Sequence, residues 1–305
     1  MKQQYPSHST ARRIAHHLTV AKCAHGIPKP RGPSTESQMI HSVGTERTYK
    51  AAIELFLNWR AELGLNMSGP YSSDDMQEFL YECSEIYEQK QINTIRQALQ
   101  VVFDVSLQNV ESERSTDLVT RAYQAEELQM VLRHQCPRNQ LATQLCHAAG
   151  LRAHELFSIV RHEGNNKPSS HRQWRSDLHT HREPLKEYIV TGKGGLKRSV
   201  GLPIALAAEL ELTIRSSPVT VVDREIKYEK CWYDVSGGQA LSQSFTDASK
   251  KALGWSCGLH GLRHSFAQRR LRELRDAGVA TDDALRIVSE ELGHFRPSIT
   301  LVYLR

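Results

Sequence analysis

The sequence predicts a mostly α-helical protein with a small antiparallel β-sheet, divided into two domains. Three observations support this prediction. The chain has 305 residues, which exceeds the size of an average single domain. Apolar residues recur at helical spacing through much of its length, and two β-prone runs flank a glycine-rich turn near its middle. No apolar run approaches the roughly 18 residues that a membrane helix needs, so the composition indicates a globular protein.

The first predicted domain, residues 41–107, consists of helices. Gly64 is placed to end the first helix, and Ser72 with Asp75 has the spacing of a capping box at the start of the second. Apolar residues at intervals of three and four mark the interior of each helix. The predicted helices span residues 45–63, 72–83 and 92–103.

The segments on either side of this domain lack a strong periodic pattern. Residues 1–40 contain several Pro, Gly and Ser residues, so we expect a partly flexible N-terminal extension with at most one short helix. Residues 108–120 begin with a polar stretch and are expected to form an interdomain linker. The second domain then covers residues 121–305.

The second domain mixes helices with one β-hairpin. Strands are expected at residues 187–191 and 198–202, on either side of the turn 192–195. Residues 162–184 have no usable periodicity and are expected to form a long surface loop. We expect helices at 125–134 and 140–149, and a helical remainder after the hairpin that is interrupted by a turn-rich interlude at 236–238.

Charge and cysteine content limit the possible partners and compartment. Residues 121–305 carry 27 Lys and Arg against 20 Asp and Glu, residues 1–40 carry 6 against 1, and residues 41–120 carry 6 against 13. A basic C-terminal half suits a polyanionic partner, although a solvated charged surface explains the imbalance almost as well. Six widely separated cysteines and the absence of an apolar leader indicate a cytoplasmic protein with free thiols.

Four short motifs carry residues suited to the chemistry of phosphodiesters. They are Gly150–Leu156 (GLRAHEL), Lys193 in the hairpin turn, His260–His264 (HGLRH), and Leu292–His294 (LGH) followed nine residues later by Tyr303. Displacement at a phosphodiester gathers charge on the non-bridging oxygens, so an enzyme without a metal needs fixed cations beside them. Arg152 and Arg263 suit this task, because a guanidinium group matches phosphate geometry and stays charged.

This order of motifs resembles that of the tyrosine recombinase (phage integrase) family. Members of that family carry an arginine in a Gly-Leu-Arg-x-x-Glu-Leu box, a hairpin lysine, a His-x-x-Arg pair, a Leu-Gly-His box and a final tyrosine. All six positions are filled here, by Arg152, Lys193, His260, Arg263, His294 and Tyr303. The likeness covers residues 41–305, and it implies a helical core-binding domain that binds DNA, followed by a mixed α+β catalytic domain.

The resemblance also implies a mechanism. Tyr303 would attack the scissile phosphate, forming a 3′-phosphotyrosyl bond and releasing a 5′-hydroxyl. Lys193 would protonate the departing oxygen, His260 would act as the general base, and His294 would donate a hydrogen bond to the phosphate. A phenol, with an ordinary pKa of about 10, leaves more readily than an alkoxide, so the covalent bond can be reversed without ATP. No cofactor and no metal are expected.

The implied partners are double-stranded DNA recombination sites, bound by a homotetramer that joins two duplexes, with accessory DNA-bending proteins as further candidates and no membrane. The expected role is integration or excision of a mobile element, including transposition, by a cytoplasmic, nucleoid-associated bacterial enzyme. Two alternatives stay open at this point. One is cleavage and resealing of a single strand by a type IB topoisomerase, and the other is a catalytically silent DNA-binding regulator.

Residues beside the motifs have structural interpretations. Glu155, three residues after Arg152, is expected to orient that arginine or to cap its helix. His264 is expected in the core or behind the active site, pointing away from the neighbouring His-x-x-Arg pair. Lys197 and Arg198 also flank the hairpin and could replace Lys193 as the acid, but the position of Lys193 between two glycines favours Lys193.

Two other groups of residues are assigned no function. His16, His17, Cys23 and His25 suggest zinc, but their spacing does not match a known ligand pattern, so the sequence argues against a metal site there. Trp174, which lies between two arginines, could contact DNA, but an ordinary surface loop is the favoured interpretation.

Overall fold

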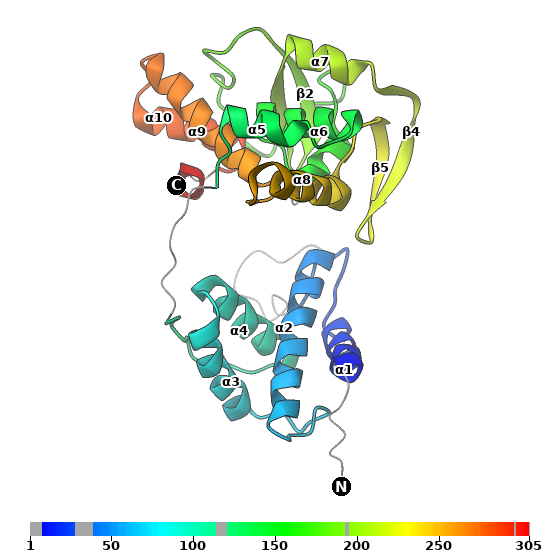
Figure 1. Cartoon of the computed structure of the whole chain (residues 1–305), viewed down its shortest axis with the longest axis vertical. Helices are drawn as coiled ribbons and strands as arrows, with labels where there is room; N and C mark the ends of the chain where they lie inside the picture. The colour runs from blue at the N-terminus through cyan, green and yellow to red at the C-terminus, as the bar shows by residue number, and fades with distance from the viewer. Residues whose placement is uncertain (1–7, 28–38, 114–120, 193–194, 296, 305) are drawn as a thin grey trace. The chain divides into compact units, whose positions relative to one another are not determined.

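In the computed structural model, the chain forms two compact units, Met1–Asp117 and Leu118–Arg305 (Figure 1). The structure describes residues 8–27, 39–113, 121–192, 195–295 and 297–304. None of the helices in these ranges is long and apolar enough to cross a membrane. The six cysteines all lie in the described ranges and form no disulfide.

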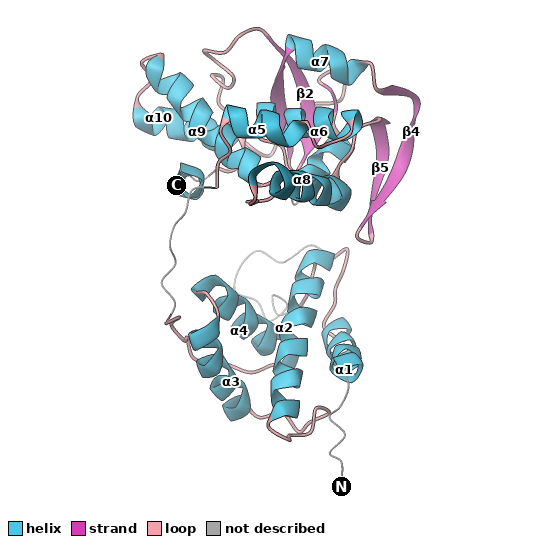
Figure 2. Cartoon of the chain, in the orientation of Figure 1, coloured by secondary structure: helices cyan, strands magenta, loops and turns pink. Residues whose placement is uncertain are grey.

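Unit 1 is built from helices in its described residues, and the three helices predicted there are confirmed (Figure 2). The helices are α1 His8–Val20, α2 Val43–Glu62, α3 Ser73–Ile86 and α4 Gln89–Phe103. Ser72 caps α3 by accepting a hydrogen bond of 3.0 Å from the Asp75 N–H, as predicted. Gly64, with a φ of 75°, follows the end of α2. Phe56 stands at the centre of an aromatic core, 5.9 Å from the Trp59 ring and 5.4 Å from the Phe79 ring.

Segments outside the three predicted helices also belong to the core of unit 1. Ala11 and Ala15 of α1 are fully buried in the same cluster as the residues of α2. Leu107 and Val110, which follow α4, are 6% and 5% exposed. The helical unit therefore includes part of the expected N-terminal extension, and it continues past residue 108, where the linker was expected to begin.

Unit 2 surrounds a three-stranded antiparallel sheet with helices (Figure 2). The sheet order is β1-β2-β3, and Tyr188 of β2 pairs with Val200 of β3, which confirms the predicted hairpin. The strands are β1 Val160–Arg161, β2 Leu185–Thr191 and β3 Lys197–Pro203. The helices are α5 Ala125–Leu132, α6 Pro137–Ala149, α7 Ile204–Glu211, α8 Gly238–Leu253, α9 Gly261–Asp276, α10 Thr281–Glu291 and α11 Pro297–Thr300, with the short 3-10 helices η2 Ala153–Ser158 and η4 Leu301–Leu304.

The prediction that the chain is helical after the first hairpin is wrong over residues 214–233. These residues form a second antiparallel hairpin, β4 Ile214–Asp223 and β5 Ile226–Tyr233. The run from Val219 to Val222 is wholly β-branched, which favours a strand. Arg224 and Glu225 both have positive φ, as a two-residue type I′ turn requires. Neither is a Gly or Asn, so the usual sequence signal for that turn is missing.

The long loop of residues 162–184 contains no helix or strand, as predicted. Tertiary contacts nevertheless hold it in place. Ser169 exchanges two hydrogen bonds with the backbone of Lys197, of 2.9 and 3.0 Å. Trp174 packs edge-on against Phe295, with ring centroids 4.9 Å apart. The structure therefore gives Trp174 a packing role beside the Leu-Gly-His box.

Candidate active site

The arginine of the first motif is positioned by the glycine before it and the glutamate after it. Gly150 ends α6 in the left-handed conformation, and a Cβ there would lie 2.7 Å from Phe266 and 2.8 Å from Leu292. Only glycine fits that approach. Arg152 is the N-cap residue of η2, and Glu155 accepts hydrogen bonds from the Arg152 backbone N–H at 2.9 Å and from Arg152 Nη1 at 2.8 Å. The sequence predicts that Glu155 orients Arg152 or caps its helix, and these two bonds show that it does both.

A second arginine holds Glu155 from the other side. Arg198 of β3 is 1% exposed, and its Nη2 donates to Glu155 Oε2 at 2.7 Å. Its Nη1 donates to the backbone oxygen of Glu291 at 2.9 Å. Because these contacts hold the Arg198 side chain in the core, Arg198 is not available to replace Lys193 as the acid. Lys197, in contrast, is exposed.

Glu155 is fully buried among these arginines. Burial by itself would raise the pKa of the carboxyl, but Arg198, Arg263 and Arg152 lower that pKa to about 2. The group is therefore a carboxylate at neutral pH. Because its two oxygens receive donors from both sides, Glu155 fixes the orientation of Arg152 relative to strand β3.

The Leu-Gly-His motif forms the C-terminal cap of α10. Gly293 has a φ of 73°, and its N–H donates to Glu290 O at 2.8 Å. The N–H of His294 donates to Ser289 O at 2.7 Å. This pair of bonds is a Schellman motif, which commonly requires glycine at the left-handed position. The cap reverses the chain and directs His294 away from the helix axis.

His294 faces Arg152 directly. Its Nε2 lies 3.1 Å from Arg152 Nη2, and a guanidinium group has no acceptor, so Nε2 must accept and the ring proton must lie on Nδ1. Burial lowers the pKa of His294, and Arg263 and Arg152 lower it further, to about 3. The Nδ1 atom is buried and has no hydrogen-bond partner within the described ranges. The site thus offers a neutral imidazole N–H donor beside a guanidinium group.

Arg263 of α9, the other arginine predicted to bind the phosphate, donates to backbone oxygens of two other motifs. It is fully buried, and it donates from Nη1 to Gly150 O and from Nη2 to Leu292 O at 3.0 Å. Burial, together with nearby Arg152, lowers the pKa of Arg263 to about 10, so it remains charged at neutral pH. Its Nε has no partner among the residues that the structure describes.

Tyr303, carried by η4, lies among the other predicted site residues. Its side chain is 7% exposed. The ring centroid lies 5.6 Å from that of His260, 4.7 Å from that of His264 and 5.5 Å from that of His294. The Cζ atom of Arg263 is 5.7 Å from the same ring centroid. The phenol ring therefore packs on one guanidinium group and three imidazoles.

The position of His264 corrects the sequence-based prediction. It is buried, as expected, but it does not point away from the motif: its ring lies 5.7 Å from His260 and against Tyr303. The reason is that His260 and His264 are four residues apart, so they share one side of the helical turn. Burial and neighbouring arginines lower the pKa of each imidazole to about 4. Both rings are neutral at pH 7.

Lys193, the sixth predicted residue, lies outside the described residues. The turn that carries it begins beside the site, however. Gly192 donates its N–H to Leu196 O at 2.8 Å, and a Cβ at position 192 would lie 3.0 Å from Glu155 Oε1 and 3.8 Å from Arg152 Nη1. Five of the six predicted residues therefore lie together, and Gly192, where the hairpin turn begins, lies beside them. The five are Arg152, His260, Arg263, His294 and Tyr303.

Comparison with solved structures identifies the fold. The chain is similar to XerH site-specific recombinase bound to a palindromic difH substrate in a post-cleavage complex, with a TM-score of 0.57 at 15% identity over 100% of this chain and 94% of that one. The pre-cleavage complex of XerH with difH gives 0.57 at 14% identity, with the same coverage. A lambda integrase (75–356) dimer bound to a COC′ core site gives 0.54 at 16% identity, over 97% of this chain and 95% of that one.

No protein-family model and no curated protein matches the chain by sequence. The structural likeness spans both units, and it confirms the fold that the motifs implied, a mostly helical protein with small antiparallel sheets and the architecture of tyrosine recombinases.

Proposed function

We propose that this chain is a tyrosine-type site-specific DNA recombinase whose nucleophile is Tyr303. The observation that carries the proposal is the convergence of Tyr303, Arg263 and two imidazoles, which come from motifs far apart in the sequence. The likeness to DNA-bound recombinase structures supports the same class of reaction. Unit 2 would carry the chemistry, and the helical residues 41–107 would contribute DNA binding.

In the first step, the Tyr303 oxygen attacks the scissile phosphorus and displaces the 5′ oxygen of the next nucleotide. The P–O bond to the tyrosine forms as the P–O5′ bond breaks, and no net energy source is needed because one phosphodiester replaces another. His260 is neutral at pH 7, so it can accept the phenol proton. Lys193 would supply the proton that the departing oxygen takes up.

The cations and N–H donors of the site suit the negative charge that develops on the non-bridging phosphate oxygens. Arg152 retains about a quarter of its side-chain exposure, so it can reach a phosphate oxygen from the surface. The Nδ1–H of His294 and the Nε–H of Arg263 are unused donors among the described residues. Preorganised donors of this kind lower the barrier because they need no reorientation during the reaction.

In the second step, a 5′-hydroxyl from a partner strand attacks the phosphotyrosine, which restores Tyr303 and joins the strands in a new combination. Exchange between two duplexes requires four such sites, so the proposed assembly is a homotetramer on DNA, with DNA-bending proteins as candidate accessory factors. The proposed biological context is integration, excision or transposition of a mobile element.

The test is capture of the covalent intermediate. The substrates are nicked DNA duplexes of randomised sequence. Cleavage near the nick releases a short strand that carries the 5′-hydroxyl, so the covalent adduct cannot religate and is seen after denaturing electrophoresis. We expect an adduct with the intact chain in the presence of EDTA, and its loss in Tyr303→Phe. Tyr228→Phe, a tyrosine on strand β5 of the same unit, is the matched control and should retain the adduct.

The outcomes also separate the two alternatives. A regulator would select sequences from the library by affinity but give no adduct, and an undiminished adduct in Tyr303→Phe would exclude this nucleophile. A topoisomerase would relax supercoiled plasmids without any selected sequence. A recombinase would exchange strands only between duplexes that carry the sequence enriched in the adduct.

A further inference from the structure

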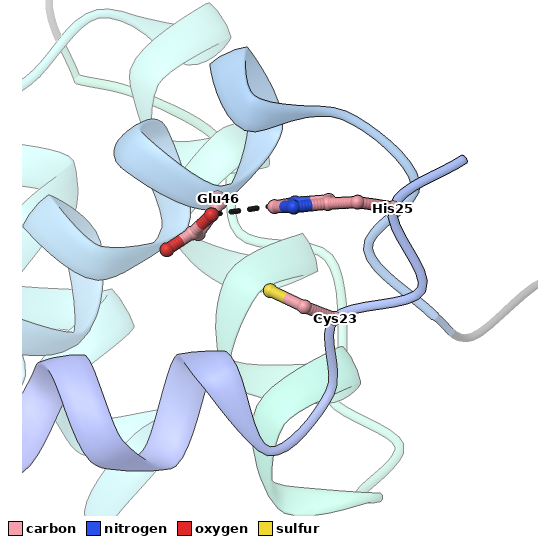
Figure 3. A group of neighbouring side chains, drawn as sticks. All are labelled: Cys23, His25 and Glu46. Atoms are coloured by element: carbon pink, nitrogen blue, oxygen red, sulfur yellow. Dashed lines mark ion pairs between the residues drawn. The ribbon is translucent and has the colours of Figure 1, made fainter. Parts of the chain in front are cut away.

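Three side chains of unit 1 that can ligate a metal point toward one another (Figure 3). They are Cys23 and His25, in the segment after α1, and Glu46, in the first turn of α2. Their ligand atoms all lie within 4.8 Å of one another, and His25 Nε2 is 3.3 Å from Glu46 Oε2. None of them belongs to the proposed active site in unit 2.

The spacing of these atoms suits tetrahedral coordination. Zinc binds imidazole nitrogen and carboxylate oxygen at about 2.0–2.2 Å, so two such ligands around a tetrahedral ion lie roughly 3.3–3.6 Å apart. The separation of 3.3 Å between His25 and Glu46 fits that range. A thiolate, an imidazole and a carboxylate are also a ligand set that zinc accepts, whereas calcium and magnesium prefer oxygen ligands.

Backbone hydrogen bonds hold Cys23 beside Ile40, in the segment that leads into α2, without help from an ion. Cys23 pairs with Ile40 in a parallel bridge, in which Ala24 N–H donates to Ile40 O and Ile40 N–H donates to Lys22 O, both at 2.8 Å. Lys22 is also ion-paired with Asp104, after α4. The ligands are therefore presented by a preformed scaffold, which lowers the entropic cost of binding.

We propose that Cys23, His25 and Glu46 bind one zinc ion, with the remaining coordination position open to water. Binding would release the thiol proton to solvent and convert Cys23 into a thiolate ligand. The ion would fasten the segment after α1 to the start of α2. His16 and His17, which the sequence had suggested beside Cys23 and His25, are exposed on α1 and take no part.

The sequence pattern argued against this site because one of its ligands is distant. Glu46 lies 21 residues after His25 and on a different helix, so no local spacing rule includes it. Without an ion, His25 pairs with Glu46, and the Cys23 thiol lies beside the same carboxylate and donates to Thr19 O at 3.5 Å. The experiment must therefore distinguish a metal site from an ordinary surface ion pair.

The full-length chain, stripped with EDTA and dialysed, is titrated with zinc in competition with a chromogenic chelator, and separately with cobalt. We expect one equivalent of zinc to bind and cobalt to give the near-ultraviolet charge-transfer band of a thiolate ligand. Cys23→Ser should abolish the band, and Glu46→Gln should weaken zinc binding at least tenfold. Cys136→Ser, which alters an exposed cysteine of unit 2, should change neither.

Folding of each variant is checked by circular dichroism, and His25→Asn provides an independent ligand variant if Cys23→Ser is unstable. Substoichiometric zinc binding, a cobalt spectrum without the thiolate band, or equal zinc affinity in wild type and Glu46→Gln would overturn the proposal. Capture of the Tyr303 adduct with metal-free protein would be unaffected by any of these outcomes, so the two proposals fail independently.

Discussion

The Glu155 carboxylate links two parts of the buried core, because it pairs with Arg152, at the N-cap of η2, and with Arg198 of β3. Replacing it by Gln would leave Arg198 buried without its charged partner. Removing one partner of a buried pair typically costs about 3–5 kcal/mol. We expect Glu155→Gln to lose stability of that order in urea unfolding, and also to lower the rate of adduct formation under conditions where the variant is folded.

Glu291 offers a matched control for that prediction. It is 2% exposed and pairs with buried Arg270 at 3.0 Å, so Glu291→Gln removes the same charge from a comparable environment. Its side chain does not contact Arg152. We expect a similar loss of stability and a smaller loss of cleavage rate. Equal losses of cleavage rate in the two variants would mean that Glu155 contributes only to folding.

Individual site residues could be predicted where a motif contains them, and not where their partners are distant. Glu155 lies three residues from Arg152, so its role followed from helical spacing. Its contact with Arg198, 43 residues away, exists only in the folded chain. The contact between His264 and Tyr303 was missed for a different reason, since it needs the C-terminal segment to return onto α9.

At the scale of the element, the C-terminal cap of α10 determines where His294 points. Gly293→Ala would place a Cβ 3.0 Å from Arg198 Cδ and would force alanine into the left-handed conformation, at a cost of roughly 1–2 kcal/mol. We expect that loss of stability together with at least a tenfold fall in the rate of adduct formation, measured in single turnover, because a misdirected His294 would no longer reach the phosphate in the proposed mechanism.

Gly278→Ala is the control for Gly293→Ala, because it disturbs a helix cap that does not position His294. Gly278 ends α9 in a second Schellman motif, with a φ of 84°, and a Cβ there would meet nothing within 4 Å. Gly278→Ala should lose similar stability and keep its cleavage rate. If both alanine variants slow cleavage to the same extent, the direction of His294 is not the cause.

Elements were predictable where periodicity and local signals agreed. The three predicted helices of unit 1 have an apolar period of 3.6, α3 also has the Ser72 cap, and the first hairpin of unit 2 has a glycine-rich turn. The hairpin of β4 and β5 was missed because its turn uses Arg224 and Glu225 at positive φ. Pairing between β4 and β5 offsets the conformational cost of this turn, and that pairing cannot be read from the residues of the turn.

At the scale of the whole molecule, the lowered pKa values of histidines are concentrated in unit 2. Burial lowers the pKa of six imidazoles from an ordinary value of 6.5, to about 4 for His260 and to about 3 for His294. The six are His147, His154, His179, His260, His264 and His294. The proposed general base is thus kept neutral by the same burial that makes the folded unit sensitive to acid.

The sign of that sensitivity follows from proton binding. Below pH 6.5 the unfolded chain takes up protons that His147, His260 and His264 do not bind in the folded unit until the pH approaches about 4, so the free energy of unfolding falls as the pH falls. Each such proton contributes a slope of up to about 1.4 kcal/mol per pH unit. We expect unit 2 to lose stability steadily between about pH 7 and pH 5, measured by urea dependence of hydrogen exchange in α9 and α10.

His147→Asn removes one of these imidazoles without changing a proposed catalytic residue, so it should make the slope of stability against pH shallower. A slope that is flat in the wild type, or unchanged in His147→Asn, would contradict this account of the buried histidines.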